Sequence, residues 1–310
     1  MNLCVIILTY NEAANIGPCL DSLAGIDAAV YVVDSHSTDS TTDILQKRGI
    51  TFVQHPFENY ARQRNWAQQN CHHSCDWVLH LDAGERLTPE LARWLNHAFD
   101  PDGPADGFLF SRKTIFMDRW IRYGGHYPNY HLRLFRRDKG RCEAKSYDQH
   151  FVCSGPVVLA PNGVDLIDHV SENIVAFTQG HTRWAIAEAV ERMSRTTPAG
   201  EVRPRFWGNP IERRRWLKTR FFDRSALFVR AFLYFFYRYI VRLGFLDGRP
   251  GLAFHFLQGC WFRFLIDTAI LEIRRRAAQT GQSIPETVEQ LYGSQFRPET
   301  SRPDQPKAQN

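Results

Sequence analysis

The first hundred residues alternate between continuous apolar runs and segments with helical spacing. Continuous apolar runs are typical of strands buried on both faces of a parallel sheet, whereas apolar residues three or four positions apart are typical of helices. The predicted strands are residues 3–9, 29–33, 50–53 and 77–81, and the predicted helices are 15–23, 38–48, 60–70 and one that starts at Thr88-Pro89-Glu90. This order predicts an α/β fold with an open, mostly parallel sheet covered by helices on both faces.

The rhythm changes after Asp106, where short predicted strands at 107–112, 131–135 and 155–159 are separated by long irregular stretches. From about Gly180 the pattern becomes helical. We therefore expect three parts: a catalytic domain over 1–180, a helical region over 181–296, and a polar, proline-rich disordered tail over 297–310.

Polar residues gather where three predicted strands end. The strings TYNE at 9–12, DSHS at 34–37 and DAGE at 82–85 each follow an apolar run. In open parallel sheets, ligands bind outside the carboxyl ends of the strands. The sequence therefore predicts one ligand site built from these three strings.

Charge is distributed unevenly along the chain. Residues 201–249 hold 12 Lys and Arg against 4 Asp and Glu, a balance of +8, which leaves −3 for the rest of a chain whose net charge is +5. Of the 41 Phe, Trp and Tyr residues, 14 lie between Phe221 and Phe262. A basic and aromatic segment indicates a membrane surface or a nucleic acid as partner.

A helical wheel of residues 225–241 favours the membrane. Arg224, Arg230, Arg238 and Arg242 fall within one arc of 120°, beside a wide apolar face. This pattern is typical of a helix in a membrane interface with its arginines toward anionic headgroups. Two helices packed on the catalytic domain remain the alternative, and no nucleic-acid motif accompanies the segment, so we expect no nucleic acid as partner.

Composition excludes several classes of protein. Hydrophobic residues make up 44% and charged residues 23%, which argues against global disorder. No charge-free run is long enough for a spanning helix, and the N-terminus does not resemble a signal peptide. The seven cysteines are irregularly spaced and do not form a disulfide framework, so we expect a cytoplasmic protein. The string CHHSC at 71–75 resembles a metal cluster, but no second Cys/His pair follows at zinc spacing. A helix end with surface histidines is the preferred interpretation.

Three strings together resemble a known family. VIILTYNEAANI, VVDSHSTDST and WVLHLDAGERLTPEL follow one another as in the nucleotide-binding half of family 2 glycosyltransferases, which have the GT-A fold. The later RKTIFMDRWIRYGG and YHLRLFRR are similar to the subgroup that builds lipopolysaccharide core and other surface glycans. The resemblance implies a GT-A, Rossmann-like catalytic domain, and with it a nucleotide-sugar donor.

The resemblance also implies site residues for the nucleotide. The loop after the first strand meets the base, the aspartate after the second strand contacts the base or ribose, and a basic residue on the helix before the fourth strand faces the nucleotide. These residues are Thr9, Tyr10, Asn11, Glu12, Asp34 and Arg64. Many members have a second acidic residue where this chain has Ser35.

The DXD-type motif of the family implies a divalent ion, Mg²⁺ or Mn²⁺, because a hard cation bound by oxygen ligands neutralises the leaving diphosphate. Asp82 and Glu85 are the predicted ligands here. The second aspartate of the motif is replaced by Gly84, so Asp82 alone with a later histidine such as His169 is the alternative.

An inverting transfer needs a general base for the acceptor hydroxyl, and the family places a carboxylate on the acceptor side. Asp148 is the preferred candidate and Glu143 the second. Trp120, His126 and Arg133 are candidates for the acceptor sugar site.

Together these features predict an inverting hexosyltransferase that uses a nucleotide sugar, a UDP-sugar, and a lipid-linked saccharide acceptor in lipopolysaccharide or exopolysaccharide assembly. It would act as a peripheral protein on the cytoplasmic face of the inner membrane, on an anionic surface. The alternatives are a non-catalytic, glycosyltransferase-like nucleotide-binding protein and a sugar-phosphate nucleotidyltransferase. The latter would need a glycine-rich loop where TYNE stands at residues 9–12.

Overall fold

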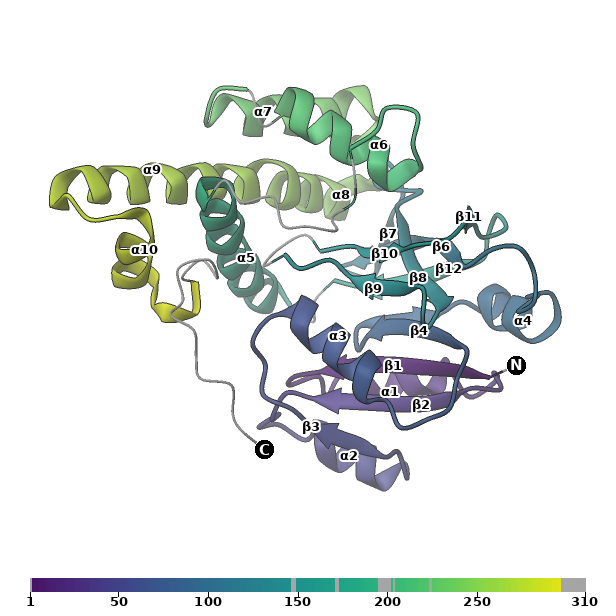
Figure 1. The fold of residues 1–310 in the computed structure, drawn as a ribbon. Coiled ribbons are helices and arrows are strands. Elements are labelled where there is room, and N and C mark those ends of the chain that lie inside the picture. Colours follow the sequence, from purple (N-terminus) through teal and green to yellow (C-terminus); the bar gives the residue numbers. More distant parts are fainter. Residues whose placement is uncertain are drawn as a thin grey trace.

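The computed structural model describes residues 2–145, 149–170, 173–194, 202, 204–222 and 225–296. In the view of Figure 1, the N-terminal strands and their helices occupy the bottom of the molecule, and helices of the C-terminal third gather at the top. Strands of the middle of the chain lie between these two layers. Any ligand held at the strand ends therefore has helices of the last third of the chain close by.

Four strands of the N-terminal half form a continuous parallel part of the main sheet, in the order β3-β2-β1-β4. The run LCVIILT of β1 (Leu3–Thr9) is buried at every residue, as expected for a central strand covered on both faces. This half confirms the predicted alternation of strands and helices. The elements are α1 (Ile16–Asp21), β2 (Ala29–Asp34), α2 (Thr41–Lys47), β3 (Phe52–Gln54), α3 (Tyr60–Asn70), β4 (Trp77–Asp82) and α4 (Pro89–His97).

Beyond β4 the sheet is mixed, so the predicted parallel arrangement is confirmed for the N-terminal half only. β8 (Tyr130–Arg136) runs antiparallel to both β4 and β6 (Gly107–Phe116). The reason is that the chain returns from β6 to β8 without a crossover helix, and a direct return reverses the strand direction. The remaining strands, most of them too short for the hydrophobic pattern to reveal, are β5 (Glu85–Leu87), β7 (Arg119–Ile121), β9 (Gly140–Cys142), β10 (Phe151–Cys153), β11 (Val157–Leu159) and β12 (Asp165–His169).

Helices cover both faces of the sheet, as predicted. One hydrophobic core packs α1, α2 and α4 against β1 and β4 through residues such as Ile16, Leu45 and Leu91. A second core lies on the opposite face, where Ala61 and Ala67 of α3 pack against the same strands. The carboxyl edge of the sheet is left open between these two cores.

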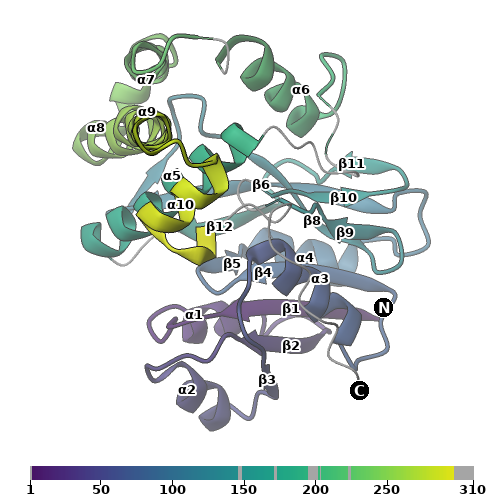
Figure 2. The ribbon, with the colours of Figure 1, turned by 60° about the vertical axis from the view of Figure 1, so that its left-hand side comes forward.

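The C-terminal region is helical, as predicted, and Figure 2 shows its helices stacked over the strands β6, β8 and β12. The first helix begins at Ile174, so it runs across the predicted boundary at residue 180. No helix among the described residues combines the length and apolar character that a membrane span requires. The predicted tail, 297–310, lies outside the described residues. The helices are α5 (Ile174–Ser194), α6 (Pro210–Leu217), α7 (Val229–Phe236), α8 (Gly248–His255), α9 (Phe262–Thr280) and α10 (Ile284–Tyr292).

The structure corrects the predicted direction of the arginines on α7 and on the π-helical turn that continues it to Val241. Arg230 is 4% exposed and forms an ion pair with Asp267 of α9. Arg238 is 5% exposed and donates to the carbonyl oxygen of Gly124. These two arginines face the protein because buried acceptors neutralise or solvate them there. Of the other two predicted positions, Arg242 is exposed and Arg224 lies outside the described residues.

The outward side of this segment is apolar instead. We call it the apolar face of α7. Its residues are about half exposed, which is unusual for so many large apolar side chains in one short segment. They are Val229, Phe232, Leu233, Phe236, Ile240 and Val241.

Candidate active site

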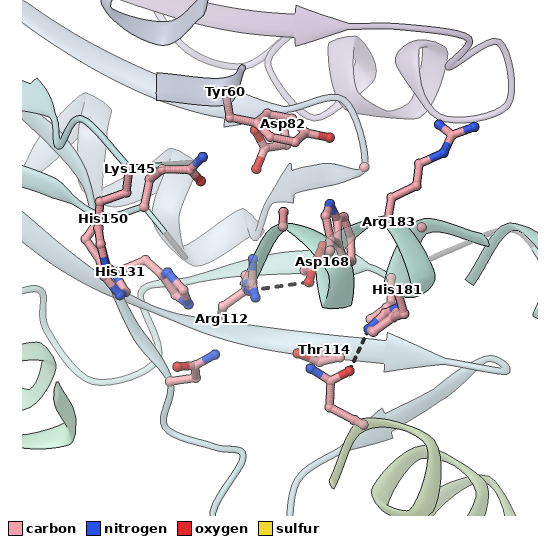
Figure 3. A pocket seen from close by; sticks show the side chains of 18 of the residues that line it. Tyr60, Asp82, Arg112, Thr114, His131, Lys145, His150, Asp168, His181 and Arg183 are labelled. Atoms are coloured by element: carbon pink, nitrogen blue, oxygen red, sulfur yellow. Dashed lines mark hydrogen bonds and ion pairs between the residues drawn. The ribbon is translucent and has the colours of Figure 1, made fainter. Parts of the chain in front are cut away.

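A cavity of about 2110 Å³ opens at the carboxyl ends of β1, β2 and β4, where the three polar strings were predicted to meet. Its walls come from two parts of the chain: the strand ends and their loops on one side, and α5, α6, α7 and β8 on the other. Figure 3 shows Asp82 and Tyr60 facing the same space as Arg112 and Asp168. A cavity thus lies where the sequence predicts the ligand site.

The end of β1 and the loop after it contribute three of their four predicted residues to the cavity wall. Thr9, Tyr10 and Glu12 line the cavity, and the ring of Tyr10 is 55% exposed. Asn11 does not line it and has a positive φ of 55°, at which its side-chain oxygen accepts a hydrogen bond from the Thr38 N–H at 2.8 Å. Asn11 therefore holds the loop in place, and Tyr10 offers a free aromatic face.

Asp34 is fully buried and does not line the cavity. Its carboxylate accepts hydrogen bonds from the Thr9 hydroxyl at 3.0 Å and from the Ser37 N–H at 2.9 Å. It joins the loops that follow β1 and β2, and the next two residues, Ser35 and His36, line the cavity in its place. A direct contact of Asp34 with the nucleotide stays a prediction.

Asp82 lies at the centre of an ionic cluster. Its side chain is 37% exposed at the end of β4 and accepts from Arg64 Nη2 at 2.8 Å and from Arg133 Nη2 at 2.9 Å. Burial works against ionisation, but the two guanidinium groups outweigh it and hold the pKa of Asp82 well below its usual range. The cavity wall thus carries a permanent carboxylate flanked by two permanent cations.

Glu85 lies behind this cluster. It is 1% exposed, and its carboxylate accepts from the Asp82 backbone N–H at 3.0 Å and from Arg133 Nη2 at 2.6 Å. Burial raises the pKa of Glu85 despite the attraction of Arg133. These contacts orient Asp82 and Arg133, and they use the carboxylate oxygens that a metal would need.

Of the two predicted ligands, only Asp82 therefore has a carboxylate placed to bind a divalent ion. Substrate oxygens and water would complete the coordination shell. A side chain at Gly84 has little room, because a Cβ atom there would lie 3.1 Å from the His169 carbonyl oxygen. A metal role for Glu85 stays a prediction that its burial does not support.

The two candidates for the general base have different outcomes. Asp148 lies outside the described residues. Glu143 is fully buried, is absent from the cavity wall, and accepts from Arg215 at 2.8 and 2.9 Å. Burial is outweighed by the Arg215 contacts, which lower the pKa of Glu143. This geometry makes Glu143 an anchor between the β9–β10 loop and α6, and its role as a base stays a prediction that its burial does not support.

Of the predicted acceptor residues, His126 and Arg133 line the cavity and Trp120 does not. His126 pairs with the Thr114 hydroxyl at 2.8 Å. Burial and the nearby Arg238 keep the pKa of His126 well below its usual value, so the imidazole is neutral.

Among the cavity-wall residues that the sequence interpretation missed are Arg112, His131 and Asp168. Arg112 and Asp168 form an ion pair at 3.4 Å that faces the cavity, and His131 has a buried Nε2 atom without a hydrogen-bond partner among the described residues. Burial and nearby arginines keep the pKa of His131 well below its usual value, so it is a neutral donor or acceptor. The available signal was the polar pair Asp168-His169 directly after the apolar Leu166-Ile167.

Comparison with known proteins finds similarity in the N-terminal half. Residues 4–156 match the family model described as Glycosyl transferase family 2. An uncharacterized glycosyltransferase of Rickettsia felis is 34% identical over 113 residues, which cover 36% of this chain and 39% of that protein. One of Rickettsia bellii is equally identical over 36% and 38% of the two chains. The chain thus matches about two fifths of the length of these relatives.

Among solved structures, S. aureus TarS 1–349 in complex with UDP-GlcNAc has a TM-score of 0.45 at 15% identity, over 91% of this chain and 93% of that one. Glucosyl-3-phosphoglycerate synthase from Mycobacterium tuberculosis, in complex with Mn²⁺ and UDP-glucose, has a TM-score of 0.29 at 21% identity, over 36% and 43%. The family match and the curated relatives concern the same part of the chain: residues 4–156 match the glycosyl transferase family 2 model, and the relatives are named as uncharacterized glycosyltransferases.

Proposed function

We propose that this chain is an inverting hexosyltransferase that moves a hexose from a UDP-sugar to a saccharide acceptor. The observation that carries the proposal is the meeting of Tyr10, Arg64 and Asp82 in one cavity at the strand ends of a domain that matches the glycosyl transferase family 2 model. The exposed ring of Tyr10 suits stacking on a nucleobase, and guanidinium groups suit the oxygens of a diphosphate.

In the proposed reaction, an acceptor hydroxyl oxygen forms a bond to the anomeric carbon while the bond from that carbon to the diphosphate breaks. The electron pair leaves with UDP, and the hydroxyl proton passes to a carboxylate base. Arg64 and Arg133 place positive charge beside the leaving group, held in position by Asp82 and Glu85. A divalent ion bound by Asp82 would add positive charge at the same place.

The proposed base is Asp148, on the strength of the sequence resemblance. A second candidate is Asp168, because it is a carboxylate of the described cavity wall and its partner Arg112 keeps it oriented. If Asp148 is the base, replacing Asp148 should abolish transfer; if Asp168 is the base, replacing Asp168 should do so. The same UDP-release assay therefore distinguishes the two candidates.

We also propose that the acceptor is linked to a lipid, as in lipopolysaccharide or exopolysaccharide assembly, and that the protein works at the cytoplasmic face of an anionic inner membrane. Leu233 belongs both to the apolar face of α7 and to the cavity wall, so the cavity reaches this face. The same helical layer carries exposed arginines at 213, 220 and 242. An apolar face with surrounding cations matches a bilayer with anionic headgroups.

The enzymatic proposal is tested by UDP release from a panel of UDP-sugars with membrane-extracted glycan acceptors. We expect Asp82→Ala to lower the rate about 100-fold or more, as loss of a preorganised charge does. Asp148→Asn should lower it about 100-fold or more if Asp148 is the base. Asp43→Asn, on the exposed side of α2, is the matched control and should retain full activity.

Full activity of both Asp82→Ala and Asp148→Asn would overturn the site assignment. UDP binding by calorimetry without turnover of any donor would instead make the chain a nucleotide-binding protein of glycosyltransferase type.

The membrane proposal is tested by sedimentation with vesicles that contain phosphatidylglycerol. Wild-type protein should pellet at low salt and less at high salt, because the cations are screened. Phe232→Ser with Phe236→Ser should reduce pelleting, while Val158→Ser, an exposed apolar residue of β11, should not. Absence of pelleting at low salt would mean that the helices only pack on the catalytic domain.

A further inference from the structure

Three cysteines meet at the end of the sheet opposite the candidate active site. Cys4 is the second residue of β1, Cys71 follows the last residue of α3, and Cys75 lies in the loop before β4. β4 runs from this loop to Asp82, which places the two sites about 17 Å apart at 3.3 Å per strand residue. We call Cys4, Cys71 and Cys75 the cysteine cluster.

The sulfur atoms of the cysteine cluster are arranged like ligands. All three Sγ atoms lie within 4.8 Å of one another, and Cys4 and Cys71 are 3.4 Å apart. Zinc–thiolate bonds of about 2.3 Å at tetrahedral angles put sulfur atoms about 3.8 Å apart. Shifts of well under 1 Å at the Cys4–Cys71 pair would therefore accommodate an ion. A disulfide needs about 2.05 Å between sulfurs, so this pair is not bonded.

Arg137 fixes the loop that carries two of these cysteines. Its guanidinium donates to the carbonyl oxygens of His73 and Cys71, both at 2.8 Å, and lies 3.6 Å from Cys75 Sγ. Three thiolates and Zn²⁺ carry a net charge of −1, which the Arg137 cation offsets. Such surrounding hydrogen bonds are typical of built metal sites.

His73, on the same loop, has a buried Nε2 atom with no hydrogen-bond partner in the part of the chain that the structure describes. The loop thus carries a free imidazole nitrogen as well as two sulfurs. Sequence spacing missed this set because the third sulfur comes from Cys4, 67 residues before Cys71.

We propose that Cys4, Cys71 and Cys75 form a binding site for a thiophilic divalent cation, Zn²⁺, that is separate from the candidate active site. Thiolate sulfur selects zinc over Mg²⁺ and Mn²⁺, which prefer oxygen ligands. Cys4 and Cys71 are buried and only Cys75 is half-buried, so the ion would be closed off from substrates and would clamp β1, α3 and the loop before β4. The role is structural, since ions held by closed thiolate sites contribute to folding stability.

The experiment uses the full chain, freed of metal by a chelator under reducing conditions and titrated with Co²⁺ and then Zn²⁺. We expect one equivalent of Co²⁺ to give a thiolate-to-cobalt charge-transfer band that one equivalent of Zn²⁺ removes. Cys75→Ser and Cys71→Ser should each weaken Co²⁺ binding about 10-fold or more. Loss of a residue that only supports a metal ligand already costs that much, and loss of the ligand itself should cost at least as much. Cys153→Ser, a half-buried cysteine outside the cluster, is the matched control and should bind as wild type does.

A second measurement does not depend on folded variants. Zn²⁺ should protect Cys71 and Cys75 of the wild-type protein from alkylation, read by peptide mass, and should leave Cys153 unprotected. Absence of the charge-transfer band, or a band that persists in Cys71→Ser and Cys75→Ser, would overturn the proposal, as would a Cys4–Cys71 disulfide in protein kept under reducing conditions. UDP binding is measured separately, so failure here leaves the proposed glycosyl transfer untouched.

Discussion

The ion pair between Arg230 and Asp267 decides which side of α7 faces outward. Both residues are buried, and Arg230 Nε lies 3.0 and 3.1 Å from the two carboxylate oxygens. The N–H of Phe228 donates to the same carboxylate at 2.7 Å. Asp267→Ala would leave the guanidinium of Arg230 in the interior without its counter-charge.

The expected cost is large because the remaining charge is desolvated. Removal of one partner of a buried ion pair destabilises a protein by about 3–5 kcal/mol, whereas an exposed pair contributes about 1 kcal/mol or less. At about 1.4 kcal/mol per tenfold change, Asp267→Ala should raise the unfolding equilibrium constant more than about 100-fold. Arg242→Ala, an exposed arginine five residues after Tyr237, should change stability by about 0.5 kcal/mol or less.

Urea unfolding followed by tryptophan fluorescence measures these differences. The double variant Arg230→Met with Asp267→Leu should be more stable than Asp267→Ala, because it leaves no uncompensated charge. Vesicle sedimentation of Arg230→Met and Arg242→Ala completes the test. The reasoning is refuted if Arg230→Met keeps wild-type stability and loses vesicle binding as Arg242→Ala does, since Arg230 would then face the lipid.

Three further predictions concern the cavity and its supports. Glu143→Gln should be less stable than wild type above about pH 4.3, the usual pKa of glutamate, because Arg215 binds the ionised carboxylate of Glu143 and lowers its pKa. The difference in unfolding free energy between the two proteins should shrink as the pH falls below that value and the carboxylate becomes protonated. Urea unfolding at two pH values measures this difference. Gly84→Asp should strengthen Mn²⁺-dependent UDP binding in calorimetry, because it restores the second aspartate of the DXD-type motif. It should cost a little stability, since the new Cβ atom would press on the His169 carbonyl oxygen. Equal Mn²⁺ dependence in both proteins would contradict the view that Gly84 replaces a metal ligand. Tyr10→Ala should weaken UDP binding about 5-fold or more through loss of stacking, with unchanged unfolding because the ring is exposed; unchanged affinity would remove Tyr10 from the nucleotide site.

The local hydrophobic pattern was sufficient to predict the strands and helices of the N-terminal half. The run LCVIIL is apolar at every position before Thr9, and such a run is typical of a strand buried on both faces, so the predicted ends of β1 match the observed ones. Because parallel strands bring their carboxyl ends to one edge, the strings after β1, β2 and β4 were also predicted to meet. The short strands β9 and β10 carried no such signal, since three residues are too few to show a period.

The chemistry at that edge depended on partners from distant parts of the chain. Asp82 was predicted as a metal ligand, and its second arginine comes from β8, 51 residues later. Glu143 fits a base by its place in the sequence, yet in the structure its carboxylate is buried and pairs with Arg215, 72 residues away. Neither partner follows from spacing, because it is the packing of elements that brings them within hydrogen-bond distance.

The sequence by itself determined the strand–helix order, the edge of the sheet that holds the site, and the residues that follow each strand, because these depend on neighbours within a few positions. Only the tertiary structure decided which charged groups are buried against a counter-charge and which face solvent. A helical wheel places Arg230 and Arg238 in one arc but carries no information on the side to which the arc turns. Asp267 of α9 fixes that side, since burial without a counter-charge would cost more than the packing gains. The same holds for Cys4, whose sulfur meets Cys71 only when β1 and α3 pack together.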